Sequence, residues 1–182
     1  MPTLWTIGHS TRSAEEFCAL LKTHSIEMLV DVRRFPGSRR YPHFGSPQLV
    51  KNLHKVGIAY RHMPDLGGRR TPRLDSQNVG WRNEGFRGYA DYMKTKAFRG
   101  AFDTLLTLAR TARTAVMCAE AVPWRCHRTL IADAAVPQGW DVRHIVDRTT
   151  AKPHVLTPFA LLDGERLTYP LTATAPSEPT LF

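Results

Sequence analysis

The stretch TLWTIGHSTRSAEEFCALLKTHSIEMLVDV, from Thr3 to Val32, decides the fold. Its first apolar run ends at Gly8, which is typical of a buried strand followed by a turn. Ser13 then stands three residues before Glu16, the spacing of a helix capping box, and the apolar residues that follow share one helical face. A second apolar run covers residues 28–32. The order strand, helix, strand predicts a βαβ unit.

The same alternation continues along the chain. Helical patterns and apolar runs predict a helix over Ser46–Gly57, a strand over Ile58–His62, two helices broken near Gly100 within Tyr89–Arg110, a strand over Thr114–Ala119, a helix over Cys126–Ala135 and a strand over Asp141–Val146. Residues 63–85 lack periodicity and predict a long loop. Alternating strands and helices imply an α/β fold, with a mostly parallel sheet of about five strands flanked by helices on both faces.

Length and composition favour one domain. The 182 residues, 42% of them hydrophobic, fit a single α/β domain over residues 1–147. Residues 148–182 are proline-rich and predict a partly irregular, loosely packed C-terminal extension. No stretch approaches the roughly 18 apolar residues of a membrane span, and the N-terminus does not resemble a signal peptide. We therefore expect a cytoplasmic protein that does not enter a membrane. Three cysteines are too few for a disulfide scaffold.

Positive charge is concentrated in one third of the chain. The formal net charge is +9, and residues 33–87 hold twelve Lys and Arg against three acids, which by itself gives +9. This concentration predicts a surface for a polyanion, either nucleic acid or a phosphate-bearing ligand. The alternative is a solvated face that only keeps the protein in solution.

Chemically capable side chains follow three of the expected strands. In parallel sheets, ligands bind beyond the carboxyl ends of the strands, where the strand order reverses. These ends carry Gly8, His9 and Ser10 after the first strand, Asp31 and Arg33 after the second, and Cys118 and Glu120 after the fourth. We expect them to share one crevice, with His9, Asp31 and Glu120 as candidate acid-base groups. Ser10 has the alternative role of helping the chain enter the first helix.

The segment DVRRFPGSRR, from Asp31 to Arg40, has two interpretations. A carboxylate in an apolar strand must be paired, so Asp31 and a neighbouring arginine would form a structural pair. Alternatively, Arg33 and Arg39 are forks for phosphate oxygens, and Ser38 adds a hydroxyl. Tyr89 also has two interpretations: its ring belongs to the core, or its hydroxyl contacts a ligand.

The segment VMCAEAVPWRCHR, from Val116 to Arg128, invites a thiol or zinc interpretation. Strand, loop and helix in this order resemble the cradle of cysteine-dependent phosphatases and sulfurtransferases, which would make Cys118 a nucleophile. The spacing departs from that pattern, because Trp124 stands where those phosphatases carry arginine. Cys126 and His127 are adjacent and no fourth ligand stands nearby, so we predict no metal, and nothing indicates a cofactor.

The same segment offers acid-base chemistry beside an anion site. Glu120 would serve as a general base, while His127 and Arg128 stand at a helix N-terminus that attracts anions. Cys118 and Cys126 would then frame the pocket. At the other end of the chain, the terminal Leu181 and Phe182 resemble peptides that dock on the bacterial sliding clamp, although chance hydrophobic residues would look the same.

An ordered set of motifs resembles one family. TIGHS, LVDVRRFPGSRR, LGG, GYADYM, and CAE followed by CHR run between Thr6 and Asp147. Together they are similar to the family called domain of unknown function 488. That resemblance implies an α/β domain and highlights the same three strand ends, but it carries no established reaction.

The function expected from these patterns is hydrolytic acid-base catalysis on nucleic acid or a nucleotide-like phosphate ligand, with DNA repair as the process that it would serve. Two alternatives stay open. One is a cysteine-dependent phosphatase or sulfurtransferase that uses Cys118. The other is a non-catalytic module that binds nucleic acid.

Overall fold

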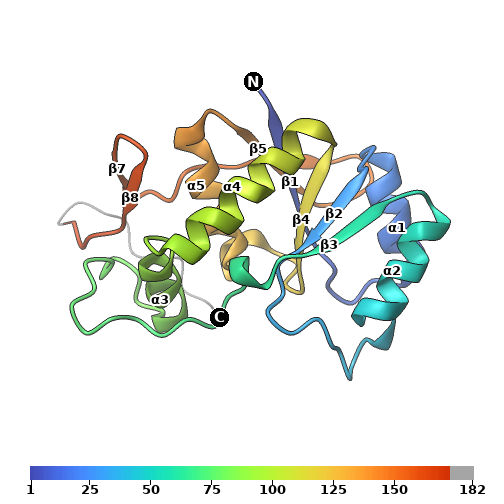
Figure 1. Ribbon diagram of the computed structural model, residues 1–182, viewed down its shortest axis with the longest axis horizontal. Helices are drawn as coiled ribbons and strands as arrows, with labels where there is room; N and C mark the ends of the chain where they lie inside the picture. The colour runs from blue at the N-terminus through green and yellow to red at the C-terminus, as the bar shows by residue number, and fades with distance from the viewer. Residues whose placement is uncertain (173–182) are drawn as a thin grey trace.

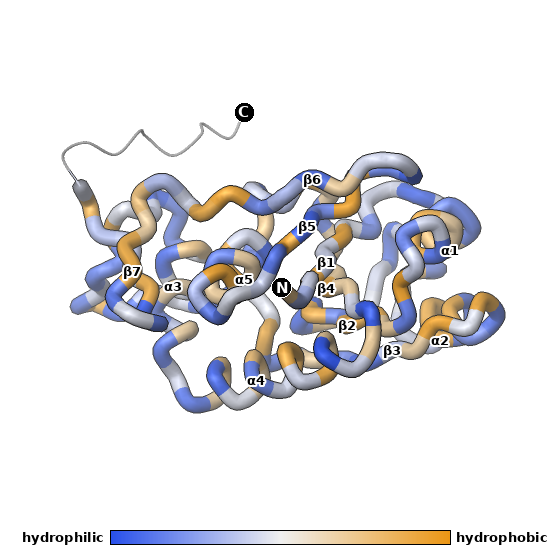
Figure 2. The backbone as a smooth tube through the Cα atoms, turned by 90° about the horizontal axis from the view of Figure 1, so that it is seen from above, coloured by the Kyte–Doolittle hydropathy of each residue, from blue (hydrophilic) through white to orange (hydrophobic). Residues whose placement is uncertain are grey.

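A computed structural model describes residues 1–172 of the chain (Figure 1). Its main sheet has the strand order β3-β2-β4-β1-β5-β6, and the labels follow one another in this order in Figure 2. The strands are β1 (Thr3–Gly8), β2 (Met28–Asp31), β3 (Ala59–His62), β4 (Thr114–Cys118), β5 (Asp141–Ile145) and β6 (Ala151–Pro153). The first five pair in parallel, and β6 runs antiparallel to β5. The predicted α/β fold with a mostly parallel sheet is confirmed.

Helices cover both faces of this sheet (Figures 1 and 2). One face carries α1 (Ala14–Thr23) and α2 (Ser46–Lys55), and the other carries α3 (Glu84–Tyr92), α4 (Lys96–Thr111) and α5 (Arg128–Ala135). Successive side chains of β1 pack alternately against the two helical layers: Leu4 packs on the α3–α5 side and Trp5 on the α1–α2 side. This alternation is the period of two that a strand between two helical layers requires.

Local signals explain most helix boundaries. The capping box predicted at Ser13 and Glu16 is present, with both reciprocal hydrogen bonds. The break predicted near Gly100 is wrong, because α3 ends at Tyr92 and α4 runs through Gly100. Thr95 starts α4 instead, since its hydroxyl accepts a hydrogen bond from the Phe98 amide. Gly100 lies on the exposed face of the helix, where nothing forces the chain to turn.

The described part of the C-terminal extension packs more closely than its composition indicates. Residues 148–172 add β6 to the sheet and form a hairpin of β7 (Leu161–Asp163) and β8 (Arg166–Thr168). Tyr169 is fully buried, and its hydroxyl donates to Asp133 of α5 at 2.9 Å. The extension therefore covers the α3–α5 layer.

Among residues 1–172, no helix is both long and apolar enough to cross a membrane. The predicted sliding-clamp contact at Leu181 and Phe182 falls outside the described residues.

Candidate functional site

A cleft of about 820 Å³ opens where β1, β2 and β4 end. The helices that follow β1 and β4, α1 and α5, lie on opposite faces of the sheet, although the two strands are neighbours. The loops that leave β1 and β4 therefore run to opposite faces of the sheet. An open parallel sheet has a crevice between two such loops. The loops after β2 and β3 and the start of α3 complete its walls.

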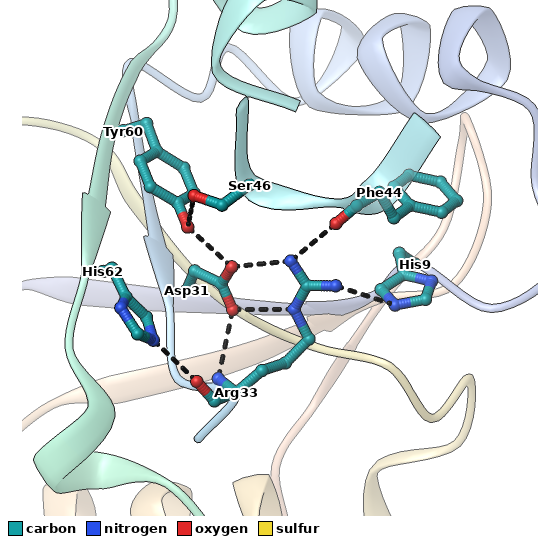
Figure 3. Close-up of polar contacts among 7 residues, drawn as sticks. All are labelled: His9, Asp31, Arg33, Phe44, Ser46, Tyr60 and His62. Carbon is teal, nitrogen blue, oxygen red and sulfur yellow. Dashed lines mark hydrogen bonds and ion pairs between the residues drawn. The ribbon is translucent and has the colours of Figure 1, made fainter. Parts of the chain in front are cut away.

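Beside the cleft, Asp31 and Arg33 form a buried ion pair (Figure 3). The Nε and Nη2 atoms of Arg33 lie 2.9 and 2.7 Å from the two carboxylate oxygens of Asp31. Asp31 also accepts from the Tyr60 hydroxyl at 2.8 Å, and Arg33 donates to the Phe44 carbonyl at 2.8 Å. Asp31 has no exposed surface and does not line the cleft. Its role is therefore to orient the Arg33 side chain.

His9 stands at the cleft end of this network. Its Nδ1 atom lies 2.9 Å from the Ser10 carbonyl and must donate to it, so the neutral ring has its lone pair on Nε2. Arg33 Nη1 lies 3.4 Å from that Nε2 atom (Figure 3). Burial, together with the nearby charge of Arg33, lowers the pKa of His9 from 6.5 to about 4. His9 is therefore a neutral acceptor at physiological pH, and the ring stacks on Phe44.

The loops after β1 and β4 are locked together. The backbone amides of His9 and Ser10 each donate at 2.9 Å to carbonyls in the β4 segment, at Cys118 and Ala119. Gly8 leaves no room for a side chain, because a Cβ atom there would overlap the Glu120 carbonyl. Ser10 has a φ of 53°, in the left-handed region that non-glycine residues rarely adopt. Such strain at the rim of a cleft is typical of functional sites.

Arg128 supports this loop from behind. Its guanidinium donates to the carbonyls of Glu120 and Ala121 at 2.7 and 3.2 Å, and also lies 3.5 Å from the Thr6 hydroxyl. Only 1% of its surface is exposed. Arg128 was expected to hold a ligand anion, but the structure places it inside the wall, where it shapes the turn that carries Glu120.

Positive charge dominates the cleft. Five arginines line it: Arg33, Arg34, Arg40, Arg69 and Arg125. Glu120 supplies the single carboxylate among the described residues that line the cleft, and its Oε1 atom accepts from the Ala121 amide at 3.1 Å. Phe35 stands among these charges with 65% of its surface exposed, and the Arg34 guanidinium lies 5.7 Å from its ring centre.

The structure brings most predicted site residues to this cleft. Those that line it are His9, Ser10, Arg33, Ser38, Cys118, Glu120, Cys126 and His127. Gly8, Asp31 and Arg128 lie directly behind its wall, as described above. Arg39 is exposed and lies outside the lining. Tyr89 is fully buried and donates to the Leu66 carbonyl at 2.7 Å, which fits its core interpretation.

Sequence patterns did not place several lining arginines in the cleft, namely Arg34, Arg40, Arg69 and Arg125. The density of basic residues in residues 33–87 indicated the first three as a group, but the sequence could not show which side chains turn inward. Within residues 1–172, no group of three His, Cys, Asp or Glu side chains is placed to hold a metal ion.

Comparison with models of protein families matches residues 13–135 to the family described as "Domain of unknown function DUF488". The match covers about two thirds of the chain and runs from the start of α1 to the end of α5. Comparisons with curated proteins and with solved structures gave no match.

Proposed function

Since this chain belongs to the DUF488 family, whose description assigns no reaction, we propose its function from the cleft itself: hydrolysis of nucleic acid or of a nucleotide-like phosphate ligand. The observation that carries the proposal is the charge of the lining, five arginines against one carboxylate. A phosphodiester backbone is the biological polyanion that such a groove suits best.

The mixture of cations and an exposed ring favours single-stranded nucleic acid. Arg33 is held rigidly by Asp31, and its Nη1 atom carries two N–H groups, of which the contact with His9 uses one. Arg34, Arg40, Arg69 and Arg125 are exposed around it. Phe35 offers an open aromatic face on which an unpaired base would stack between phosphate contacts.

Glu120 is the residue that we assign to chemistry. It is exposed on the cleft, and the Ala121 amide holds one of its two carboxylate oxygens. The other oxygen would take a proton from a water molecule that attacks phosphorus, while the arginines stabilise the negative charge that develops on the phosphate. His9 and Asp31 act through Arg33 in this scheme, as groups that position it. The wider proposal of a role in DNA repair rests on the same charge.

Salt dependence tests the binding step. We expect fluorescein-labelled single-stranded oligonucleotides to bind with an affinity that falls linearly on a logarithmic salt scale. Arg34→Ala, Arg69→Ala and Arg125→Ala should each lower the slope by about 0.7 for a single strand. Arg99→Ala, on the exposed face of α4 and outside the cleft, removes the same charge and should leave the slope unchanged.

Glu120→Gln tests the chemical step, with a panel of labelled oligonucleotides and nucleotides as substrates. The variant should bind as tightly as the parent protein and hydrolyse at least about 100-fold more slowly. Absence of salt-dependent binding would overturn the whole proposal. Unchanged hydrolysis by Glu120→Gln would remove Glu120 from the reaction. Binding with no hydrolysis by the parent protein would favour the non-catalytic module.

A further inference from the structure

Two cysteines eight residues apart in the sequence meet at the floor of the cleft. Cys118 is the last residue of β4, and Cys126 lies two residues before α5. Both line the cleft, with 3% and 7% of their surfaces exposed. Each thiol shifts the pKa of the other, so the two side chains lie close enough to interact. Neither thiol takes part in the hydrolytic reaction proposed above.

The surroundings of Cys126 favour a thiolate. Its sulfur accepts from the Arg128 amide at 3.5 Å, in the first turn of α5, and lies 3.6 Å from His127 Nδ1. Burial opposes ionisation of this thiol, but its interactions with Cys118, His127 and Arg128 outweigh the burial, so the pKa of Cys126 lies well below its ordinary value. From α3, the Tyr89 ring also faces this group, and burial raises the pKa of its hydroxyl, which stays neutral.

Cys118 has the opposite character. Burial raises the pKa of its thiol well above the ordinary value, and its interaction with Cys126 raises this pKa further. A protonated thiol in contact with a thiolate is the arrangement in which one sulfur attacks and the other then closes a disulfide. The third cysteine, Cys18, lies in the α1–α2 layer on the other face of the sheet, and burial raises the pKa of its thiol as well.

We propose that Cys118 and Cys126 form a redox-active dithiol whose substrate is a small hydroperoxide. The Cys126 thiolate attacks the terminal oxygen of the hydroperoxide and the O–O bond breaks, which leaves a sulfenic acid and an alkoxide that takes a proton from solvent. The Cys118 thiol then attacks the Cys126 sulfur. The S–S bond forms, and hydroxide leaves with the Cys118 proton as water. The two thiols lose two electrons, and the hydroperoxide is reduced to an alcohol and water.

This site does not depend on the nucleic-acid proposal, because its chemistry needs only the two sulfurs and access from the cleft. It shares the cleft floor with the arginines, however. Oxidation replaces a buried thiolate by a neutral disulfide, so the cleft becomes more positive when the pair is oxidised. A phosphate-bearing ligand would therefore bind more tightly to the oxidised form.

The test treats the reduced full-length protein with hydrogen peroxide and maps the products by peptide mass spectrometry. We expect a peptide pair linked through Cys118 and Cys126, with the loss of two hydrogen atoms. In Cys118→Ser the reaction should stop at a sulfenic acid on Cys126, which a 1,3-dione probe captures. In Cys126→Ser neither product should form at the same peroxide dose. Cys18→Ser is the matched control and should behave as the parent protein.

A measurement on the parent protein keeps the proposal falsifiable if a variant does not fold. Iodoacetamide should label Cys126 at pH 6 at least about tenfold faster than Cys18. Labelling of Cys126 that rises only near the ordinary thiol pKa of about 8.5 would overturn the assignment, as would a peroxide product that links neither Cys118 nor Cys126. Neither outcome bears on oligonucleotide binding, so this proposal and the hydrolase proposal fail separately.

Discussion

The carboxylate of Asp31 fixes the guanidinium of Arg33 in one orientation, with Nε and Nη2 bound at 2.9 and 2.7 Å. Asp31 is fully buried and Arg33 is 8% exposed, so neither charge would be stable there without the other. The pair leaves only Nη1 of Arg33 to face His9 and the cleft. A buried residue thus determines which atom the cleft presents to a ligand.

Asp31→Asn should therefore destabilise the protein strongly. It leaves the Arg33 guanidinium buried without a counter-charge, and we expect the free energy of unfolding to fall by about 3–5 kcal/mol. Tyr60→Phe is the control, because it removes one hydrogen bond to the same carboxylate and keeps the ion pair, at a cost of about 1.5 kcal/mol. Urea denaturation followed by circular dichroism measures both. Equal losses in the two variants would contradict the dominant role of the ion pair.

Gly8→Ala should disrupt the wall of the cleft. The new Cβ atom would overlap the Glu120 carbonyl, so the turn after β4 has to move, and we expect a loss of about 2 kcal/mol or more in the free energy of unfolding. Gly100→Ala makes the same change in α4, where no atom other than the neighbouring helix backbone lies within 4 Å of the new Cβ. It should stabilise the helix by about 0.5–1 kcal/mol. A tolerated Gly8→Ala would mean that the two loops do not touch in solution.

Sequence patterns predicted the α/β fold of residues 1–147 because most strands and helices there carry a local signal. Three such signals lie within thirty residues of one another: the apolar run of β1, the capping box at Ser13 and the apolar run of β2. The break between α3 and α4 was misplaced because glycine is a weak breaker on an exposed helix face, whereas the cap at Thr95 was overlooked.

The site was only partly predictable, because its contacts join residues far apart in the chain. Strand ends located His9, Arg33 and Glu120 correctly around one crevice. The role of Arg128 could not be read from the sequence, since its partners are backbone carbonyls that any residue supplies. The contact between Cys118 and Cys126 was also missed, because their spacing matches no familiar motif and only the turn between β4 and α5 brings the two sulfurs together.

Phe35→Ala tests the stacking face of the proposed nucleic-acid site. Loss of one base–aromatic stack should weaken binding of a single-stranded oligonucleotide by about 1–3 kcal/mol. The free energy of unfolding should stay within about 0.5 kcal/mol, because the ring is 65% exposed. Leu74→Ala removes another exposed apolar side chain, outside the cleft, and should change neither quantity. Anisotropy titrations at fixed salt measure the binding. Unchanged affinity in Phe35→Ala would refute stacking at this position.

Tyr169→Phe tests whether the C-terminal extension is integral to the domain. The hydroxyl donates to the buried Asp133 carboxylate, so its removal should cost about 1.5–3 kcal/mol in the free energy of unfolding. Tyr92→Phe removes a hydroxyl that donates to the Asp65 carbonyl at the surface, and should cost less than about 1 kcal/mol. Thermal or urea unfolding distinguishes the two. A neutral Tyr169→Phe would indicate that the extension contributes little to stability.

A chain of hydrogen bonds links the extension to β1 through the buried His144. The Thr6 hydroxyl lies 2.7 Å from His144 Nδ1, and His144 Nε2 lies 3.0 Å from His154 Nδ1. His154 in turn contacts Asp133 at 2.7 Å. Burial, together with the neighbouring His154 and Arg128 side chains, lowers the pKa of His144 from 6.5 to about 3.

This depressed pKa makes stability depend on pH in a defined direction. In the unfolded chain His144 binds a proton below about pH 6.5, whereas in the folded protein it stays neutral until about pH 3. The free energy of unfolding is therefore greatest above pH 6.5 and falls as the pH is lowered from 6.5 towards 3. Between pH 6.5 and pH 5 the expected loss is about 2 kcal/mol for this residue. His144→Gln should lose correspondingly less free energy of unfolding over the same interval, whatever its stability at pH 7. His54→Gln replaces an exposed imidazole on α2 and is the matched control. Urea titrations at the two pH values give the comparison, and an identical pH dependence in His144→Gln and the parent protein would show that His144 is not held neutral by the fold.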